Sequence, residues 1–310
     1  MPGRKDFVLG IDFGGTKIDV GSAVLDGEIV ATDRIETDAR NGAAQAVERG
    51  LALARSVLAR SAADGGSCVG VGVVSPGVVR DDGVLLAPNV PGWGELRLPA
   101  LVGEALGAAP VAAGNDVNAA ALAETRWGAL RDAEPGLFVS LGTGIKAAIV
   151  IGGRVFTGAN GAAGEIGYSL RDAGDGTGFA DGRAPLEEFV GGRAIGERAG
   201  RLLGEDVSAA DAFARDDLPP GFIDETLAEL SLHVANLAIA VDPARVAVGG
   251  GLMAHGDRIL AALRKRLAAA APFPPEVVAA RFPQDGALRG ALALALDLVA
   301  EPSADAEAVL

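Results

Sequence analysis

The sequence is poor in the residues that form disulfides and structural zinc sites. Its 310 residues include one cysteine, Cys68, and two histidines, His233 and His255. A single cysteine excludes an intramolecular disulfide and favours a reducing compartment. A structural zinc site takes four ligands, mostly Cys and His. The chain has only three such residues, which are too few to form a structural Cys/His zinc site.

Long apolar runs and clusters of basic residues are also absent. No run reaches the length of a membrane span, and the N-terminal residues lack the apolar core of a signal peptide, so we expect a cytoplasmic protein. The net charge of −14, without any basic run, argues against nucleic acid and against an anionic membrane surface as partners. An anionic ligand would have to be held by backbone amides, helix ends and a metal ion.

Glycine and apolar residues are abundant. The chain has 45 glycines and is 49% apolar, which indicates a turn-rich α/β protein with room for one large or two medium domains. Apolar spacing predicts helices over 43–63, 221–241 and 286–299. Strands are predicted over 68–79, interrupted by a turn at 75–77, and over 277–282, and residues 211–220 form a polar segment.

Residues 8–17, VLGIDFGGTK, form the most informative stretch. A strand ends at Asp12, a turn follows at Gly14, Gly15 and Thr16, and a second β-branched run begins. P-loops and dinucleotide fingerprints need a helix after their glycines, and here a strand follows. The exposed backbone amides could bind an anion, and Asp12 could hold a cation or its waters. An ordinary Gly-Gly hairpin with a surface aspartate explains the stretch equally well.

The same layout recurs in the second half of the chain. Residues 137–156, LFVSLGTGIKAAIVIGGRVF, again give a strand, a glycine turn, a strand and a hairpin, with Gly142 in the place of Gly15. Two copies of one unit predict two related domains, each offering a glycine turn to a shared cleft.

Two polar stretches have both a structural and a functional interpretation. Asn115 and Asp116 stand where a strand hands over to a helix; they are either a helix cap or a carboxylate placed to accept a proton from a hydroxyl. The loop at 87–99 carries Asn89 and Trp93, and the tryptophan either contacts a sugar or packs against its own domain.

A third glycine turn follows the strand VAV. Gly249, Gly251 and Ala254 satisfy the dinucleotide pattern G-x-G-x-x-A before a helix, but no acidic residue for a ribose follows about twenty positions later. We therefore interpret the turn as an adenosine platform. A dinucleotide oxidoreductase is the rival interpretation, which a test of NAD binding would decide.

Four of these stretches and the glycine-rich loop at 158–168 together resemble the ROK family of bacterial sugar kinases, a glucokinase-like branch of the actin-like ATPase superfamily. They are DFGGTK and SLGTGI (phosphate motifs), GNDVNAAALAE (catalytic aspartate), GANGAAGEIGY (sugar loop) and VAVGGGL (adenosine motif). The resemblance implies a two-lobed actin-like (ribonuclease H-like) α/β fold, each lobe a mixed sheet flanked by helices. It implies a smaller lobe of residues 1–114 plus 290–310, a larger lobe of 115–289, and an active site in the cleft between them.

The resemblance also implies an activity. A glucokinase-like ATP-dependent kinase would transfer the γ-phosphoryl group to a hexose hydroxyl, the 6-hydroxyl, with Asp116 as general base and Mg²⁺ as cofactor. Alternatives are a catalytically weak sugar-binding or regulatory ROK protein, or a kinase for another hexose or an N-acetylhexosamine, and polyphosphate is an alternative donor. The family is often homodimeric, so a homodimer is expected.

Site residues are carried over position by position. The sugar ligands would be Asn89, Asn115, Glu165, Tyr168 and Glu187. Asp12 would organise magnesium, through water. The nucleotide would be held by Asp12, Gly14, Gly15, Thr16, Lys17, Gly142, Thr143, Gly144, Gly249, Gly250 and Gly251.

The chain also departs from the family pattern. Tyr168 replaces a histidine that many members carry, which puts the substrate preference in doubt. The segment DAGDGTGFADGRAPLE has no cysteine, so the family's zinc site is expected to be absent. Lys146 stands where glycine is common, and it either lends charge to a phosphate or points into solvent.

Overall fold

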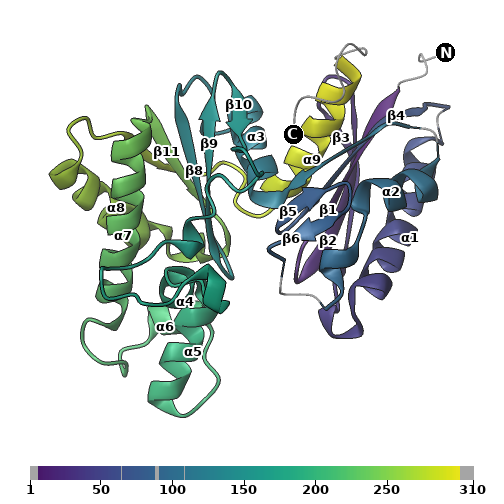
Figure 1. Cartoon of the computed structure of the whole chain (residues 1–310). Coiled ribbons are helices and arrows are strands. Elements are labelled where there is room, and N and C mark those ends of the chain that lie inside the picture. Colours follow the sequence, from purple (N-terminus) through teal and green to yellow (C-terminus); the bar gives the residue numbers. More distant parts are fainter. Residues whose placement is uncertain (1–5, 64, 88–90, 108, 301–310) are drawn as a thin grey trace. The chain divides into compact units, whose positions relative to one another are not determined.

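The computed structural model describes residues 6–63, 65–87, 91–107 and 109–300, so Asn89 lies outside the described residues. The chain forms two compact units (Figure 1). Unit 1 comprises residues 1–123 and 285–310, and unit 2 comprises residues 124–284. This division falls within helix α3 (Asp116–Trp127), whereas the boundary expected from the sequence, between residues 114 and 115, lies just before that helix.

Unit 1 is a five-stranded mixed sheet in the order β3-β2-β1-β4-β7. The first three strands form an antiparallel meander, because short turns at 14–16 and 25–28 connect them, and β4 and β7 run parallel to β1. Their bounds are β1 (Phe7–Phe13), β2 (Lys17–Val24), β3 (Ile29–Glu36), β4 (Cys68–Ser75) and β7 (Val111–Asn115), and a small hairpin pairs β5 (Val78–Arg80) with β6 (Gly83–Leu85).

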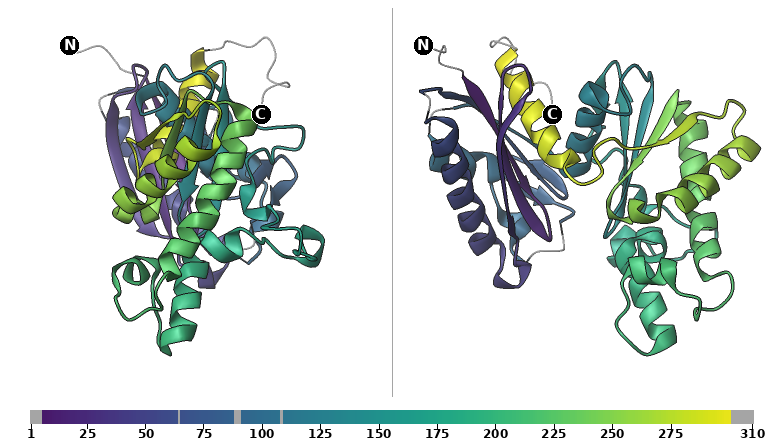
Figure 2. Two further views of the ribbon diagram at one scale, coloured as in Figure 1. Left: turned by 90° about the vertical axis from the view of Figure 1, so that its left-hand side faces the viewer. Right: turned by 180° about the vertical axis from the view of Figure 1, so that it is seen from behind.

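Helices cover both faces of this sheet (Figure 2). Helices α1 (Ala43–Ser61) and α2 (Leu98–Leu106) lie on one face, and α9 (Gly286–Ala300) lies on the other. The α9 helix lies very close to the strands: a Cβ atom built at Gly72 of β4 would be 1.8 Å from the carbonyl oxygen of Ala291. Short helices complete the unit at η1 (Ala39–Asn41) and η2 (Trp93–Glu95).

Unit 2 has the same sheet topology, with the strand order β10-β9-β8-β11-β12. Three antiparallel strands are again followed by two parallel ones, which confirms the duplication predicted from residues 137–156. The strands are β8 (Gly136–Leu141), β9 (Ile145–Ile151), β10 (Arg154–Phe156), β11 (Arg245–Gly249) and β12 (Glu276–Ala279). The helices are α4 (Glu187–Val190), α5 (Gly192–Leu203), α6 (Ala209–Ala214), α7 (Phe222–Val241), α8 (Gly256–Ala270), η3 (Ile166–Tyr168), η4 (Phe179–Asp181) and η5 (Gly251–His255).

Some elements differ from the sequence expectation. Helix α6 overlaps the polar segment at 211–220, where no helix was predicted, and a reciprocal hydrogen-bonded cap between Ser208 and Asp211 begins it. Helix α2 was not predicted. The last strand, β12, ends at Ala279 rather than at residue 282. Among the described residues, no helix is both long enough and apolar enough to cross a membrane.

Candidate active site

The first glycine turn connects β1 to β2 and is fixed from beneath. The hydroxyl of Thr37 donates to the carbonyl oxygen of Gly14 over 2.6 Å, and the Thr37 N–H donates to the carbonyl of Thr16 over 2.8 Å. A Cβ at Gly14 would lie 2.6 Å from the carbonyl oxygen of Lys17, so a larger residue does not fit. Gly15 and Thr16 are exposed at the tip. The turn is therefore a fixed loop with an accessible backbone, as the anion-site interpretation requires.

Asp12 stands at the end of β1 with a buried, unpartnered carboxylate. Its Oδ1 atom has no hydrogen-bond partner in the described structure. Burial raises its pKa well above the ordinary value, and the carboxylates of Asp116 and Asp19 raise it further. Lys17 and Arg34 act in the opposite direction, and both are ion-paired with Asp19. When Asp12 is ionised, no cation is paired directly with its carboxylate among the described residues. A bound metal ion would provide the missing positive charge.

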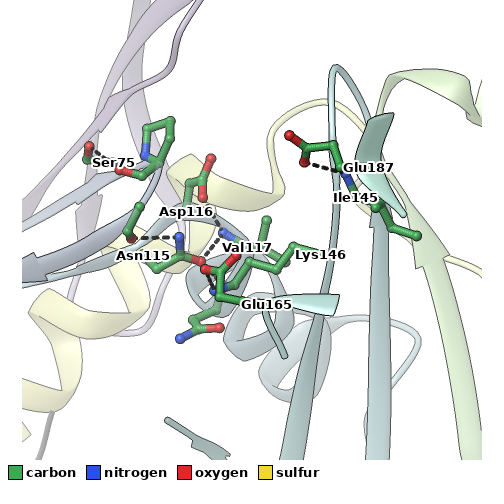
Figure 3. A network of polar contacts seen from close by, with 11 residues as sticks. Ser75, Asn115, Asp116, Val117, Ile145, Lys146, Glu165 and Glu187 are labelled. Carbon is green, nitrogen blue, oxygen red and sulfur yellow. Dashed lines mark hydrogen bonds and ion pairs between the residues drawn. The ribbon is translucent and has the colours of Figure 1, made fainter. Parts of the chain in front are cut away.

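Asn115 and Asp116 begin helix α3, where β7 ends. The Asn115 side-chain oxygen accepts hydrogen bonds from the N–H groups of Val117 (2.9 Å) and Asn118 (3.0 Å), and its amide donates to the carbonyl of Gly77 (2.9 Å) (Figure 3). Asn115 is thus the helix cap that the structural interpretation predicted. The cap fixes the backbone of Asp116, whose half-buried carboxylate accepts from Val117 N–H over 2.8 Å.

Trp93 packs against its own unit, which is one of the two roles that the sequence allows for it. Its side chain is buried, its indole N–H donates to the Ser75 hydroxyl over 2.6 Å, and its ring meets Phe13 edge-on at 5.9 Å between centroids. The indole is therefore part of the core of unit 1 rather than a sugar contact.

The second glycine turn, residues 142–144, joins β8 to β9 and lies against the start of α5. The backbone N–H groups of Gly192 and Arg193 donate to the carbonyl oxygens of Gly142 (2.9 Å) and Thr143 (3.0 Å). Thr143 itself is exposed. The turn is thereby held in a fixed position beside a helix N-terminus, which favours anionic ligands.

Glu187 supports the same turn from α4. Its Oε2 atom accepts the N–H of Ile145 over 3.1 Å (Figure 3), and a Cβ at Gly144 would lie 2.0 Å from that oxygen. Burial raises the pKa of Glu187, and the hydrogen bond from Ile145 opposes the rise. The carboxylate therefore has a structural contact to the turn that the sequence, which predicted a sugar ligand, did not indicate.

The second and third glycine turns line one cavity of unit 2, with a volume of about 730 Å³. The third turn approaches the end of β8: Gly250 has φ +95°, and a Cβ there would lie 2.3 Å from the carbonyl oxygen of Leu141. Such a volume suits a small-molecule ligand. The cavity is lined by Gly142, Thr143, Gly192, Arg193, Gly196, Glu197, Gly200, Arg201, Glu205, Asp206, Val207, Ser208, Ala209, Gly251 and Leu252.

Sequence reasoning missed the α5 wall of this cavity. The signal was the spacing of Gly192, Gly196 and Gly200 along one helix face. Cβ atoms at Gly196 and Gly200 would lie 2.5 and 2.6 Å from the carbonyl oxygens of Val207 and Glu205. Glycine thus lets the segment 205–209 lie directly on α5.

The loop at 157–183 carries Glu165 and Tyr168. The Glu165 carboxylate is ion-paired with Lys146 of β9 at 2.5 Å (Figure 3). The Tyr168 ring meets Phe179 edge-on at 5.3 Å between centroids. Burial raises the pKa of Tyr168, and so do the carboxylates of Glu165 and Glu187, so its hydroxyl remains a hydrogen-bond donor at neutral pH.

Arg171 fastens this loop to two helices. Its guanidinium lies 3.6 Å from the centroid of the Phe189 ring in α4, and its Nε donates to Glu229 of α7 over 3.0 Å. Arg198 of α5 also stacks on Phe189, at 3.8 Å. His233, whose side chain is 11% exposed, lies 3.5 Å from the same glutamate, which agrees with a packed rather than a ligating histidine.

Two α/β units of one topology, each with a glycine turn after its first strand, define the two-lobed actin-like ATPase fold. The chain belongs to the ROK family, whose model matches residues 8–298.

Relatives of the chain include sugar kinases of more than one specificity. It is 34% identical over 298 residues to the N-acetylmannosamine kinase of Shigella boydii, covering 93% of this chain and 97% of that protein. It is 30% identical over 291 residues to the glucokinase of Halalkalibacterium halodurans, covering 84% and 85%. Among solved structures, a ROK glucokinase from Streptomyces griseus in complex with glucose and AMPPNP matches with a TM-score of 0.76 and 28% identity, covering 94% and 99%.

Proposed function

We propose that the protein is an ATP-dependent sugar kinase that transfers the γ-phosphoryl group to a hexose hydroxyl, the 6-hydroxyl, with Asp116 as general base. The observation that carries the proposal is the pair of carboxylates in unit 1. Asp12 is buried and its Oδ1 atom has no hydrogen-bond partner in the described part of the chain, and Asp116, at the capped start of α3, is close enough to raise the pKa of Asp12. Phosphoryl transfer to a hydroxyl uses one carboxylate that helps to bind the metal cation and a second carboxylate that accepts the proton of the hydroxyl.

The nucleotide would be held mainly by backbone groups. The cavity of unit 2 joins the turn at 142–144 to the triple-glycine turn at 249–251, so phosphates at the first and adenosine at the second would occupy one volume. The turn at 14–16, with Lys17, would bind phosphate oxygens from unit 1. This assignment suits the acidic chain, since amides and a helix N-terminus provide attraction without a basic surface.

The environment of Asp12 fits a hydrated magnesium ion. Mg²⁺ keeps several waters and uses one or two carboxylates together with substrate phosphates, and the orphaned Oδ1 of Asp12 offers one such acceptor. Bound magnesium would neutralise charge that develops on the transferring phosphoryl group. The carboxylate would then lose the electrostatic penalty that raises its pKa.

Asp116 would accept the proton of the attacking sugar hydroxyl. The Asn115 cap fixes its backbone, and one amide hydrogen of Asn115 remains for the sugar. The hydroxyl of Tyr168 would donate to the sugar. The remaining sugar ligands would be Asn89, Glu165 and Glu187.

The test is the variant Asp116→Asn in an assay that couples ADP formation to a light-absorbing product. Because general-base help is worth roughly 10² to 10⁴ in rate, kcat should fall by that factor while calorimetry shows sugar binding retained. Asp224→Asn is a matched control, since Asp224 is an exposed acid in the first turn of α7. Wild-type turnover in Asp116→Asn would contradict the assignment of the base.

A second set of assays defines the substrate. Wild-type protein with ATP and magnesium would be tested on glucose, mannose, fructose, N-acetylglucosamine and N-acetylmannosamine, and with polyphosphate in place of ATP. Sugar binding without turnover of any of them would identify a regulatory sugar-binding protein instead. Light scattering would test the expected homodimer.

A further inference from the structure

Lys146 is a buried cation inside strand β9. Its side chain is 8% exposed, and its ammonium lies 2.5 Å from Oε1 of Glu165, whose side chain is 18% exposed. In the part of the chain that the structure describes, this is the only hydrogen bond or ion pair of the lysine side chain. The charged group therefore has little access to water and a single partner.

The pair leaves hydrogen-bonding capacity unused. An ammonium has three N–H donors and a carboxylate has two oxygens, so two donors and the Oε2 oxygen remain after the one contact. Buried polar groups without partners cost free energy, because they lose water without replacing it. The donor and the acceptor lie side by side, with the hydroxyl-bearing Tyr168 near Glu165.

Stability alone does not account for this pair. Buried ion pairs are often no more stabilising than apolar residues of similar volume, because desolvation offsets their attraction. Ile145 and Ala147 of β9 belong to the apolar core of unit 2. Lys146 lies on the opposite face of the strand with the buried Ala148 and Val150, where a methionine or leucine would bring no charge to desolvate. A ligand that completes the hydrogen bonds of both groups is a sufficient reason for placing them together.

We propose that Lys146 is a specificity-determining residue that, with Glu165, binds two neighbouring hydroxyls of the sugar ring. One hydroxyl donates to Glu165 and the adjacent hydroxyl accepts from Lys146. The inference rests on the proposed function and deepens it, because it defines the substrate as a hexose with an intact vicinal diol at the two bound carbons.

The test compares glucose with its 2-deoxy, 3-deoxy and 4-deoxy analogues. The double variant Lys146→Met/Glu165→Gln removes both charges at nearly constant volume and so avoids an unpaired buried charge. Lys265→Met is the matched control, because Lys265 is exposed on α8. The readouts are kcat/KM for each sugar, KM for ATP and the melting temperature.

Wild-type protein should prefer glucose to the analogue that lacks a bound hydroxyl by roughly 10- to 100-fold, the usual effect of losing a hydrogen bond to a charged group. In the double variant this ratio should fall close to one, with KM for ATP unchanged. Ratios that stay at the wild-type values in a folded double variant would overturn the proposal. If the double variant does not fold, Lys146→Arg, which keeps the charge but moves the donors, is judged by the same ratios.

Failure of the kinase proposal would look different. In that case the wild-type protein turns over none of the sugars, and calorimetry of glucose and the deoxy analogues still measures whether the pair discriminates between them. Equal affinity for all four sugars in wild-type protein would reject the role of Lys146, whatever the outcome for catalysis.

Discussion

Gly290 offers the most direct test of how the fold positions the proposed base. It lies in α9, where a Cβ atom would be 2.0 Å from the carbonyl oxygen of Ala119 in α3. Real Cβ atoms are essentially never found within 3.0 Å of such an atom, so Gly290→Ala would force the two helices apart by about 1 Å. Asp116 begins α3, less than one turn before Ala119, and would move with it.

The expected effect on stability has two opposing parts. Alanine in place of glycine favours a helix by about 0.5–1 kcal/mol, whereas overpacking costs about 1–3 kcal/mol. A net loss of about 0.5–2 kcal/mol lowers the melting temperature by roughly 1–8 °C for a domain of this size. Because a 1 Å misplacement of a catalytic group can cost about 10²-fold in rate, kcat should fall by about that factor.

The assay pairs thermal unfolding with the coupled kinase assay and uses Gly103→Ala as control. Gly103 is also helical, in α2, but its nearest neighbour would be the Val111 side chain at an ordinary 3.7 Å. Gly103→Ala should therefore stabilise the protein by about 0.5–1 kcal/mol and leave kcat unchanged. If Gly290→Ala proved as stable and as active as Gly103→Ala, the close crossing of α9 and α3 would not constrain the site.

Two further predictions concern Asp12 and Arg171. Burial, then neighbouring carboxylates, raise the pKa of Asp12, so its ionisation removes stability as pH rises through that raised pKa. Asp12→Asn should therefore raise the melting temperature near neutral pH, and this gain should disappear as the pH is lowered towards the ordinary carboxyl pKa of about 3.9. The same variant should lose magnesium-dependent turnover. A gain in melting temperature that does not depend on pH would contradict the prediction. Arg171→Met removes the stacking and the ion pair to Glu229 and should raise KM for the sugar several-fold at unchanged KM for ATP. Arg183→Met, at an exposed pair in the same loop, should change neither, and equal effects of the two variants would refute the role of Arg171.

The features predicted well from sequence are those that local patterns specify. The alternating strands and the glycine turns at 14–16 and 142–144 gave the duplicated hairpins, because turn residues and period-two patterns act over a few residues. The cap at Asn115 was among the stated alternatives for the same reason. Helices α2 and α6 were missed although local signals existed, a proline at the second helical position in α2 and the Ser208–Asp211 cap in α6.

The site's electrostatics could not be predicted, because they arise from residues far apart in the chain. Glu187 is 42 residues from the Ile145 amide that it supports, and Lys146 is 19 residues from Glu165. The isolation of the Asp12 carboxylate depends on the burial of the whole β1 strand. No local pattern encodes such neighbours, since they are set by how strands and helices pack.

The sequence by itself determined the family, the duplicated hairpins and the positions of the three glycine turns, because each depends on motifs and backbone conformations that short segments dictate. Only the tertiary structure decided that the Asp12 Oδ1 atom has no hydrogen-bond partner among the described residues, that Trp93 belongs to the core and that Lys146 is buried against Glu165. The physical reason is that burial and charge pairing are properties of packed neighbours, and these become neighbours only once the chain has folded.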